Sequence, residues 1–150
     1  MDVGIIPGTD DKPTIPFRRR GEYSVRVFLL LAGLIGLVSV AFGAIAEHTI
    51  RPAVDAEYFR YLMTGVRYNQ VHAVALLALA FGLGLPLADA TRGRVQIAAW
   101  LMVVGTVLFS GSIYLAVSLD VMAITYLTPV GGTLLMGAWL ALIWAGWKAR

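Results

Sequence analysis

Four long stretches of the chain carry no Asp, Glu, Lys or Arg. They cover residues 27–46, 68–88, 95–119 and 121–147, and their apolar residues run continuously instead of alternating with polar ones. A helix needs about 20 residues to cross a hydrocarbon core of ~30 Å. Only helices and closed barrels can cross, and barrel strands show alternating polarity. The pattern therefore predicts four transmembrane helices, at about 25–46, 68–87, 95–117 and 122–147.

The connections between these spans differ in length. Residues 88–94 and 118–123 are short turns, which makes the spans they join antiparallel neighbours. In the longest connection, 47–67, apolar residues recur at helical spacing, which predicts a short amphipathic helix in the outer interface. The alternative is that this segment runs continuously into the second span through Gly65. The predicted fold is an all-α membrane protein, an antiparallel bundle of four transmembrane helices with a short interfacial helix in the first outer loop.

Composition agrees with a protein dissolved in lipid. Hydrophobic residues make up 59% of the 150-residue chain and charged residues 14%, with a mean hydropathy of +0.77. Soluble domains carry about a quarter charged residues, so an ordinary soluble enzyme and a disordered chain are excluded. The net charge is only +3 and the basic residues form no stripe beside aromatic ones, so no nucleic-acid partner is expected. Without cysteine there are no disulfides and no thiolate metal sites.

The basic residues predict the orientation, because Lys and Arg accumulate in cytoplasmic loops. Four spans place nine of them on the side of the two termini, against three on the other side. The nine are Lys12, Arg18, Arg19, Arg20, Arg26, Arg92, Arg94, Lys148 and Arg150, and the three are Arg51, Arg60 and Arg67. We therefore expect a multi-pass protein of the bacterial inner membrane with both termini in the cytoplasm. Residues 1–24, rich in proline and glycine, are predicted to form an irregular cytoplasmic arm before the transmembrane domain of residues 25–150.

Polar residues gather at the predicted outer ends of the first two spans. This outer-face cluster consists of Glu47, His48, Arg67, Tyr68, Gln70 and His72. Ionisable groups at membrane depth suggest function, although these are predicted to lie at shallow depth. In one interpretation the cluster is structural, and Glu47 and Arg67 form an ion pair at the base of the loop. In the other, the cluster binds a ligand. In the weakest interpretation the two histidines ligate a haem or a pigment metal.

Small and hydroxyl-bearing residues mark the expected helix contacts, since helices in lipid associate by close approach. Pro129 is expected to kink the fourth span. The predicted packing residues are Gly36, Gly43, Ser110, Gly111, Ser112, Pro129, Gly131, Gly132, Gly137 and Ala141. In the fourth span, small residues stand four apart at Thr133, Gly137, Ala141 and Ala145. Such patterns recur throughout membrane bundles, which favours packing within the bundle, and dimerisation through the fourth span is the alternative.

No set of residues in the chain fits a catalytic site. The FSGSIY stretch at 109–114 follows no strand and has no base beside it, so it is not a nucleophile elbow. Gly82 and Gly84 are not followed by the Lys-Ser/Thr pair of a phosphate loop. We expect a protein that is not an enzyme and that has no cofactor and no bound metal.

Four motifs resemble one family in order along the chain. They are FGAIAEH at 42–48, GVRYNQVHAVALL at 65–77, FSGSIY at 109–114 and ITYLTPVGG at 124–132. Together they resemble the YgdD-like family of small inner-membrane proteins, also called domain of unknown function family 423. The resemblance implies four membrane helices, and it points to no particular reaction because the biochemical role of the family is not established. The family has a vertebrate relative in mitochondria, so it also implies the mitochondrial inner membrane as the alternative location.

Three functions stay open at this point. The first is a non-catalytic accessory or structural subunit of a larger membrane complex, with residues 1–24 as a docking arm for other subunits. The second is a small transporter or lipophile-binding protein with a polar site near His48, Arg67, Tyr68 and His72. The third is the haem or pigment ligation by His48 and His72. A polar cleft that opens outward would favour the second.

Overall fold

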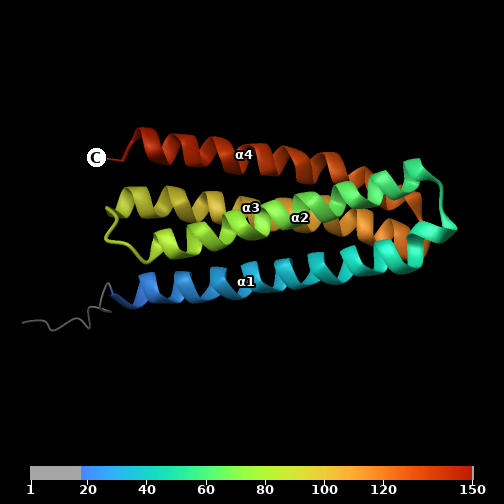
Figure 1. Ribbon diagram of the computed structural model, residues 1–150. Coiled ribbons are helices and arrows are strands. Elements are labelled where there is room, and N and C mark those ends of the chain that lie inside the picture. The colour runs from blue at the N-terminus through green and yellow to red at the C-terminus, as the bar shows by residue number, and fades with distance from the viewer. Residues whose placement is uncertain (1–17, 150) are drawn as a thin grey trace, which may run out of the picture.

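The computed structural model describes residues 18–149, and their side chains from residue 22. These residues form four long helices and contain no strand. The helices lie side by side along one axis (Figure 1). They are α1 (Arg18–Ile45), α2 (Ala56–Leu83), α3 (Asp89–Leu119) and α4 (Thr128–Trp147). Short helical turns η1 (Ala46–Ile50) and η2 (Arg51–Ala53) follow α1, and η3 (Met122–Leu127) precedes α4.

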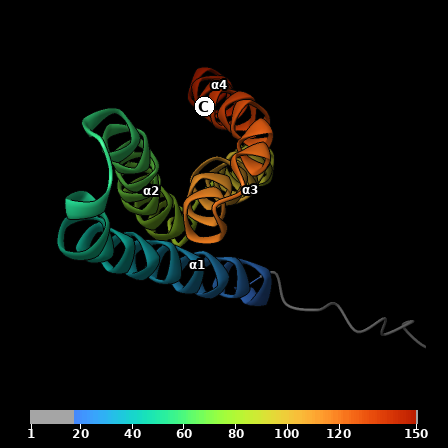
Figure 2. The same cartoon turned by 90° about the vertical axis from the view of Figure 1, so that its right-hand side faces the viewer.

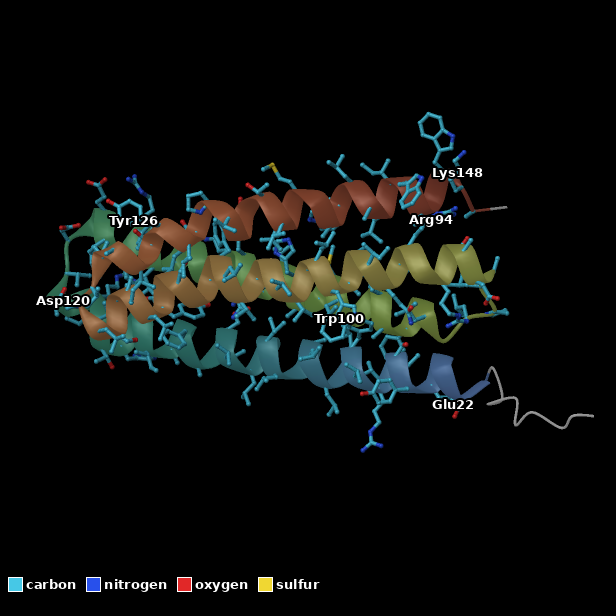
Figure 3. The ribbon with its side chains drawn as sticks, turned by 180° about the vertical axis from the view of Figure 1, so that it is seen from behind. Glu22, Arg94, Trp100, Asp120, Tyr126 and Lys148 are labelled. Carbon is cyan, nitrogen blue, oxygen red and sulfur yellow. The ribbon has the colours of Figure 1, made fainter. Side chains whose placement is uncertain are left out.

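Consecutive helices are neighbours in space. α1 packs on α2, α2 on α3, and α3 on α4. α2 and α4 share no extended packing, and Figure 2 shows them standing apart on the two sides of α3. We call the end of the bundle where α1 begins and α4 ends the termini end, and the end that holds η1, η2 and η3 the loop end. Figure 3 labels Arg94 and Lys148 at the first and Asp120 and Tyr126 at the second.

Three helical stretches are long and apolar enough to cross a membrane: Glu22–Ala53, Asp89–Leu119 and Met122–Trp147. α2 has 28 residues but is not among them. Its composition is the reason, because Arg67, Asn69 and Gln70 stand in its middle, whereas residues 73–83 are apolar. Length and hydropathy therefore identify three of the four predicted spans.

The separate interfacial helix is not observed in the first loop. Asp55 caps α2 by accepting a hydrogen bond from the Tyr58 backbone N–H at 2.8 Å, and the helix then continues unbroken to Leu83. Gly65 does not end it, because this glycine is where α2 approaches Ile113 of α3: a Cβ here would lie 3.2 Å from the Ile113 side chain. Residues 56–67 are therefore the first turns of α2, as in the alternative that the sequence left open.

The other two differences from prediction concern the ends of helices. α1 begins at Arg18, so residues 18–24 of the predicted arm are helical, and residues 1–17 lie outside the described residues. The predicted fourth span divides into the 3₁₀ turns of η3 and α4 proper. Pro129 stands in the first turn of α4, where its missing N–H breaks no helical bond, instead of kinking a longer helix.

Buried polar side chains are unevenly distributed along the bundle. Towards the termini end the core is apolar, built around Phe28, Leu76 and Leu83. The middle and the loop half contain buried groups that need hydrogen bonds, and these are Ser39, Asn69, His72, Thr106, Ser110 and Ser112. Buried polar groups in a bundle of this kind are costly unless they have hydrogen-bond partners, so a functional site is expected in this half of the bundle.

Candidate functional site: a groove between α2 and α4

A groove with a volume of about 790 Å³ lies between α2 and α4, with α3 beneath it. It is open on one side and occupies the loop half of the bundle. Its lining residues come from four elements: Tyr61, Tyr68 and His72 (α2), Phe109 (α3), Thr125 (η3), and Thr128, Pro129, Gly132, Thr133, Leu135, Met136 and Trp139 (α4). Ligand sites in proteins usually measure about 300–1,000 Å³ and are mostly apolar with a few polar groups, so size and lining both fit a binding site.

His72 connects the two walls of the groove. Its Nδ1 lies 2.7 Å from the Tyr68 carbonyl oxygen, and Trp139 Nε1–H donates to its Nε2 at 3.3 Å. A carbonyl can only accept and an indole N–H can only donate. The contacts therefore select the neutral imidazole that is protonated on Nδ1. The Trp139–His72 bond joins two helices that do not otherwise pack, about halfway along α4.

Aromatic rings form the wall and the floor of the groove. Tyr68 stacks on Phe109 with ring centroids 4.4 Å apart and 23° between the planes. The rings of Trp139 and His72 are arranged edge-on, with their centroids 6.2 Å apart. Stacked and edge-on arrangements are the favourable ones for aromatic pairs, so these rings hold each other in place.

The groove offers few free polar groups and no charge. Thr125 and Thr133 donate to backbone carbonyls of their own elements, and Thr128 shares a hydrogen bond of 2.7 Å with Ser112. Among the described side chains that line the groove, the hydroxyls of Tyr61 and Tyr68 have no hydrogen-bond partner. None of the lining residues is Asp, Glu, Lys or Arg. The site therefore suits an uncharged molecule with a polar group at one end.

Interhelical hydrogen bonds fix α2 beside the groove. Ser110 Oγ donates to the Gly65 carbonyl at 2.8 Å, and Ser39 Oγ donates to the Val66 carbonyl at 3.3 Å. Asn69 Nδ2 donates to the Tyr114 hydroxyl at 3.3 Å. Bonds of this kind between membrane helices contribute about 0.6 kcal/mol each. Their common effect is to hold one face of α2 against α1 and α3, which leaves Tyr68 and His72 facing α4.

Comparison with known proteins places the chain in a family. The model of the family described as "Protein of unknown function (DUF423)" matches residues 42–132. The chain belongs to this family. A UPF0382 membrane protein of Haemophilus influenzae is 33% identical over 82% of this chain and 95% of its own length, and YwdK of Bacillus subtilis is 33% identical over 83% and 98%. The UPF0382 inner membrane protein YgdD of Escherichia coli is 30% identical over 79% and 87%. No solved structure matches the chain.

Membership confirms the resemblance drawn from the four motifs, and it identifies a membrane protein. The matched segment of this DUF423 protein includes most of the groove, from Tyr61 to Gly132. Four lining residues of α4 lie beyond it: Thr133, Leu135, Met136 and Trp139.

The predicted outer-face cluster divides in the structure. Tyr68 and His72 line the groove, whereas Arg67 and Gln70 are exposed elsewhere on α2. His48 is exposed in η1, so the two histidines are not brought together. In the part of the chain that the structure describes, no three His, Cys, Asp or Glu residues gather as metal ligands.

The predicted Glu47–Arg67 ion pair is replaced by another. Glu47 Oε2 lies 2.6 Å from Arg51 Nη1, one helical turn further along the chain. The helical path of η1 brings residues i and i+4 to the same side, whereas Arg67 lies on α2. The position along the bundle also differs from the prediction, since His72 is level with the middle of α4 and not with its first turn at the loop end.

The predicted packing residues occupy different environments. Gly131 is closest to a neighbouring backbone, that of Phe109 and Gly105, while Gly132 faces the Phe109 ring. Gly36 faces Ala73, Gly43 faces Val66, and a Cβ on Gly137 would lie 4.0 Å from Leu101. A Cβ on Gly111 would meet no atom of another segment within 4 Å, and Ala141 is half-buried. The buried face of α4 consists of Gly131, Leu135, Ala138 and Ala145.

Sequence reasoning missed Trp139 as a site residue. It lies in an uncharged span, and nothing local distinguishes it from Trp144 or Trp147. Its partner His72 is 67 residues away in the chain. Trp139 lines the groove because α2 and α4 lie on the two sides of α3. No short sequence motif encodes that arrangement.

Proposed function

We propose that this protein crosses the inner membrane four times and binds an uncharged amphiphile in the groove between α2 and α4. The single observation that carries the proposal is the groove itself: charge-free, aromatic-walled and bridged by Trp139 and His72. The family relatives called membrane proteins, and YgdD called an inner membrane protein, support the location.

Burial and the surrounding helices support α2 as the fourth crossing. Asn69 is 3% exposed, because it points into the bundle. Arg67 is exposed, and its position towards the N-terminal half of α2 lets its long side chain extend to the head-group region, as membrane arginines do. The outward sides of the other helices carry large apolar residues such as Leu30, Leu34 and Leu37 of α1. Soluble proteins avoid such surfaces.

The orientation follows from the basic residues. Arg94 and Lys148 lie at the termini end (Figure 3), and so do Arg26 near the start of α1 and Arg92 near the start of α3. We place this end in the cytoplasm. The groove then occupies the outer half of the bilayer, with His72 near the midplane.

The distribution of polar groups favours binding over transport. Polar groups line the groove and the bundle down to about the level of His72 and Thr106. Below that level the buried residues are apolar until Thr91 at the termini end. Conduction of a polar solute needs polar groups along the whole path, and here they stop about halfway.

A photoactivatable probe tests the proposal. We expect a diazirine analogue of hexadecanol, added to purified protein in detergent, to crosslink to groove residues of α2 and α4. The variant Thr133→Trp fills the groove from an exposed position, so it should reduce crosslinking there by about tenfold, the factor for losing about 1.4 kcal/mol of binding. The matched control is Leu140→Trp, which adds the same ring to an exposed position of α4 that does not line the groove.

Peptide mapping of the crosslinks gives the readout. Labelling spread evenly over the lipid-facing sides of all helices, and unchanged by Thr133→Trp, would refute the groove as the site. Stronger labelling by a diazirine analogue of palmitate would refute the preference for an uncharged head group.

The accessory-subunit function stays a second proposal, favoured by one observation. α4 packs along α3 alone, and its groove side exposes Thr133 and Met136, which a helix from a partner subunit could cover. Purification in mild detergent separates the two functions. A co-purifying protein that is present in wild type and in Leu140→Trp but lost from Thr133→Trp would place a partner helix, and not an amphiphile, in the groove.

A further inference from the structure

The groove between α2 and α4 has two different ends. Towards the loop end it is lined by Tyr61 and Tyr68, whose hydroxyls have no hydrogen-bond partner among the described residues. At the other end His72 and Trp139 bond to each other, and the second ring nitrogen of His72 contacts the Tyr68 carbonyl. The hydrogen-bonding groups that are free for a ligand therefore lie towards the loop end.

Tyr61 stands at the mouth of the groove. It also lines a smaller depression of about 290 Å³ at the loop end, together with Asp55, Glu57, Tyr58 and Met122. Tyr68 follows Tyr61 by seven residues, close to two turns of α2, so both side chains lie on one face of the helix. Long side chains in a helix lean towards its N-terminus, and α2 begins at the loop end. Both hydroxyls are therefore directed towards the mouth.

This polarity orients the ligand of the proposed function. Resting on that function, we propose that the bound amphiphile is a lipid of the outer leaflet, with its uncharged head group beside Tyr61 and Tyr68 and its chain ending at the His72–Trp139 bridge. A phenolic hydroxyl can donate one hydrogen bond and accept another, which suits a hydroxyl or carbonyl oxygen on the head group. None of the residues that line the groove is Asp, Glu, Lys or Arg, so nothing there neutralises a charged head group.

The length of the groove matches one leaflet of the bilayer. Tyr61 and His72 are eleven residues apart in α2, and so are Thr128 and Trp139 in α4. At a rise of about 1.5 Å per residue, each wall is about 16 Å long. One leaflet takes up half of a hydrocarbon core of ~30 Å, which is about 15 Å. A chain that starts at Tyr61 therefore reaches the bilayer midplane at the His72–Trp139 bridge.

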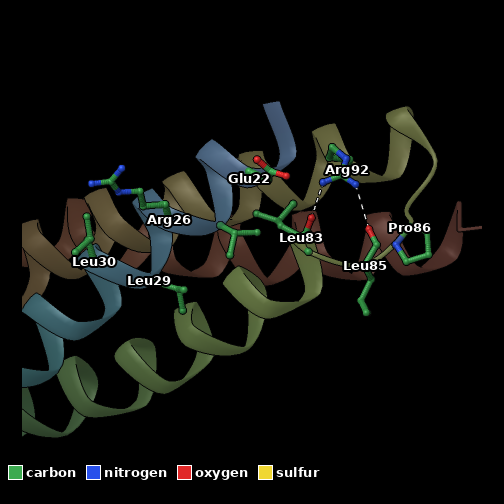
Figure 4. Close-up of a pocket in the computed structure, with 10 residues that line it drawn as sticks. Glu22, Arg26, Leu29, Leu30, Leu83, Leu85, Pro86 and Arg92 are labelled. Carbon is green, nitrogen blue, oxygen red and sulfur yellow. Dashed lines mark hydrogen bonds between the residues drawn. The ribbon is translucent and has the colours of Figure 1, made fainter. Parts of the chain in front are cut away.

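The groove does not continue to the termini end, so the head group has no second place there. The depression at that end, shown in Figure 4, is bounded by α1, α2 and α3 and shares no lining residue with the groove. In it Arg92 donates to the Leu83 and Leu85 carbonyls at the end of α2. A lipid in the opposite orientation would bring its head group to the His72–Trp139 bridge, where both partners are already engaged. Burying a polar group without a partner is costly.

Two photoactivatable forms of hexadecanol test the orientation in the purified full chain in detergent. One carries the diazirine beside the hydroxyl and the other carries it at the methyl end. We expect the first to crosslink mainly around Tyr61 and Thr125, and the second mainly around His72 and Trp139. The reversed pattern would overturn the orientation while leaving the groove a binding site. If neither probe labels the groove more than the lipid-facing sides of the helices, the proposed function fails and the orientation fails with it.

Tyr61→Phe tests the recognition of the head group, because it keeps the ring and its packing and removes only the hydroxyl. The concentration of unlabelled hexadecanol that halves the crosslinking should rise about fivefold, which corresponds to about 1 kcal/mol. Competition by hexadecane, which has no head group, should not change. The matched control is Tyr126→Phe, which removes the same hydroxyl from a tyrosine of η3 that is 82% exposed and does not line the groove.

Two results would refute the role of Tyr61. One is an equal hexadecanol concentration for Tyr61→Phe and Tyr126→Phe. The other is an equal loss of competition by hexadecanol and by hexadecane in Tyr61→Phe, which would mean that the substitution alters packing and not hydrogen bonding to a head group.

Discussion

Replacing Gly131 with alanine is expected to force α3 and α4 apart and to cause the largest loss of stability of any single methyl group added to this protein. A Cβ at this position would lie 2.8 Å from both the Gly105 carbonyl oxygen and the Phe109 Cα, and closer still to the Phe109 backbone nitrogen. These are backbone atoms, so no side-chain rotation relieves the overlap. Overpacking costs up to about 3 kcal/mol, which lowers the melting temperature of a chain of this size by about 10 °C.

The matched control for this prediction is Gly111→Ala on the facing helix. A Cβ there would meet no atom within 4 Å, and alanine favours helix over glycine. Thermal unfolding in detergent is monitored by size-exclusion chromatography. The melting temperature should fall strongly for Gly131→Ala and change little for Gly111→Ala. Equal melting temperatures for Gly131→Ala and wild type would contradict the packing of α4 on α3 as described.

Asn69→Asp is the second substitution with a large expected effect. The asparagine is 3% exposed, and its amide donates to the Tyr114 hydroxyl. The aspartate has nearly the same shape but loses that donor and adds a negative charge inside the bundle. A carboxylate at the centre of a membrane helix costs about 3 kcal/mol, so we expect most of the folded protein to be lost from the membrane fraction.

Gln70→Glu provides the control for Asn69→Asp, because it adds the same charge to the next residue of α2, which is exposed. Folded yield is measured for both variants by fluorescence-detected size exclusion of a tagged protein. The expected order is wild type, then Gln70→Glu, then Asn69→Asp. A yield for Asn69→Asp that equals that of Gln70→Glu would mean that Asn69 does not point into the bundle.

Most of the fold could be predicted from the uncharged runs, because helix length and hydropathy are local properties of the chain. The start of α2 could not be predicted in this way, since the sequence allows either a break or a continuous helix at Gly65. That choice depends on whether Gly65 ends a helix or lets α2 approach Ile113, which is a contact between distant segments. The predicted partner of Glu47 was wrong because the prediction assumed an ion pair between distant segments, with Arg67. The observed partner is local: Arg51 lies one helical turn further along the chain.

The groove was predictable only in part. Tyr68 and His72 could be predicted as site residues because polar side chains within a membrane helix are costly and therefore suggest a function. The wall that faces them is built from Thr133, Met136 and Trp139, ordinary residues of an apolar span. Their role depends on α2 and α4 lying on the two sides of α3, which follows from the packing of the four helices together and from no single motif.

The central claim is that α2 crosses the membrane together with the three helices identified by hydropathy. The chain has no cysteine, so single cysteines can be introduced at exposed alanines on either side of α2, Ala53→Cys and Ala88→Cys, and near the C-terminus, Ala149→Cys. The decisive measurement is their labelling by a membrane-impermeant maleimide in spheroplasts of a bacterial host. Four crossings predict that Ala53→Cys is labelled at once and that the other two variants are labelled only after permeabilisation. Labelling of the cysteines at 53 and 88 from the same side would contradict the account.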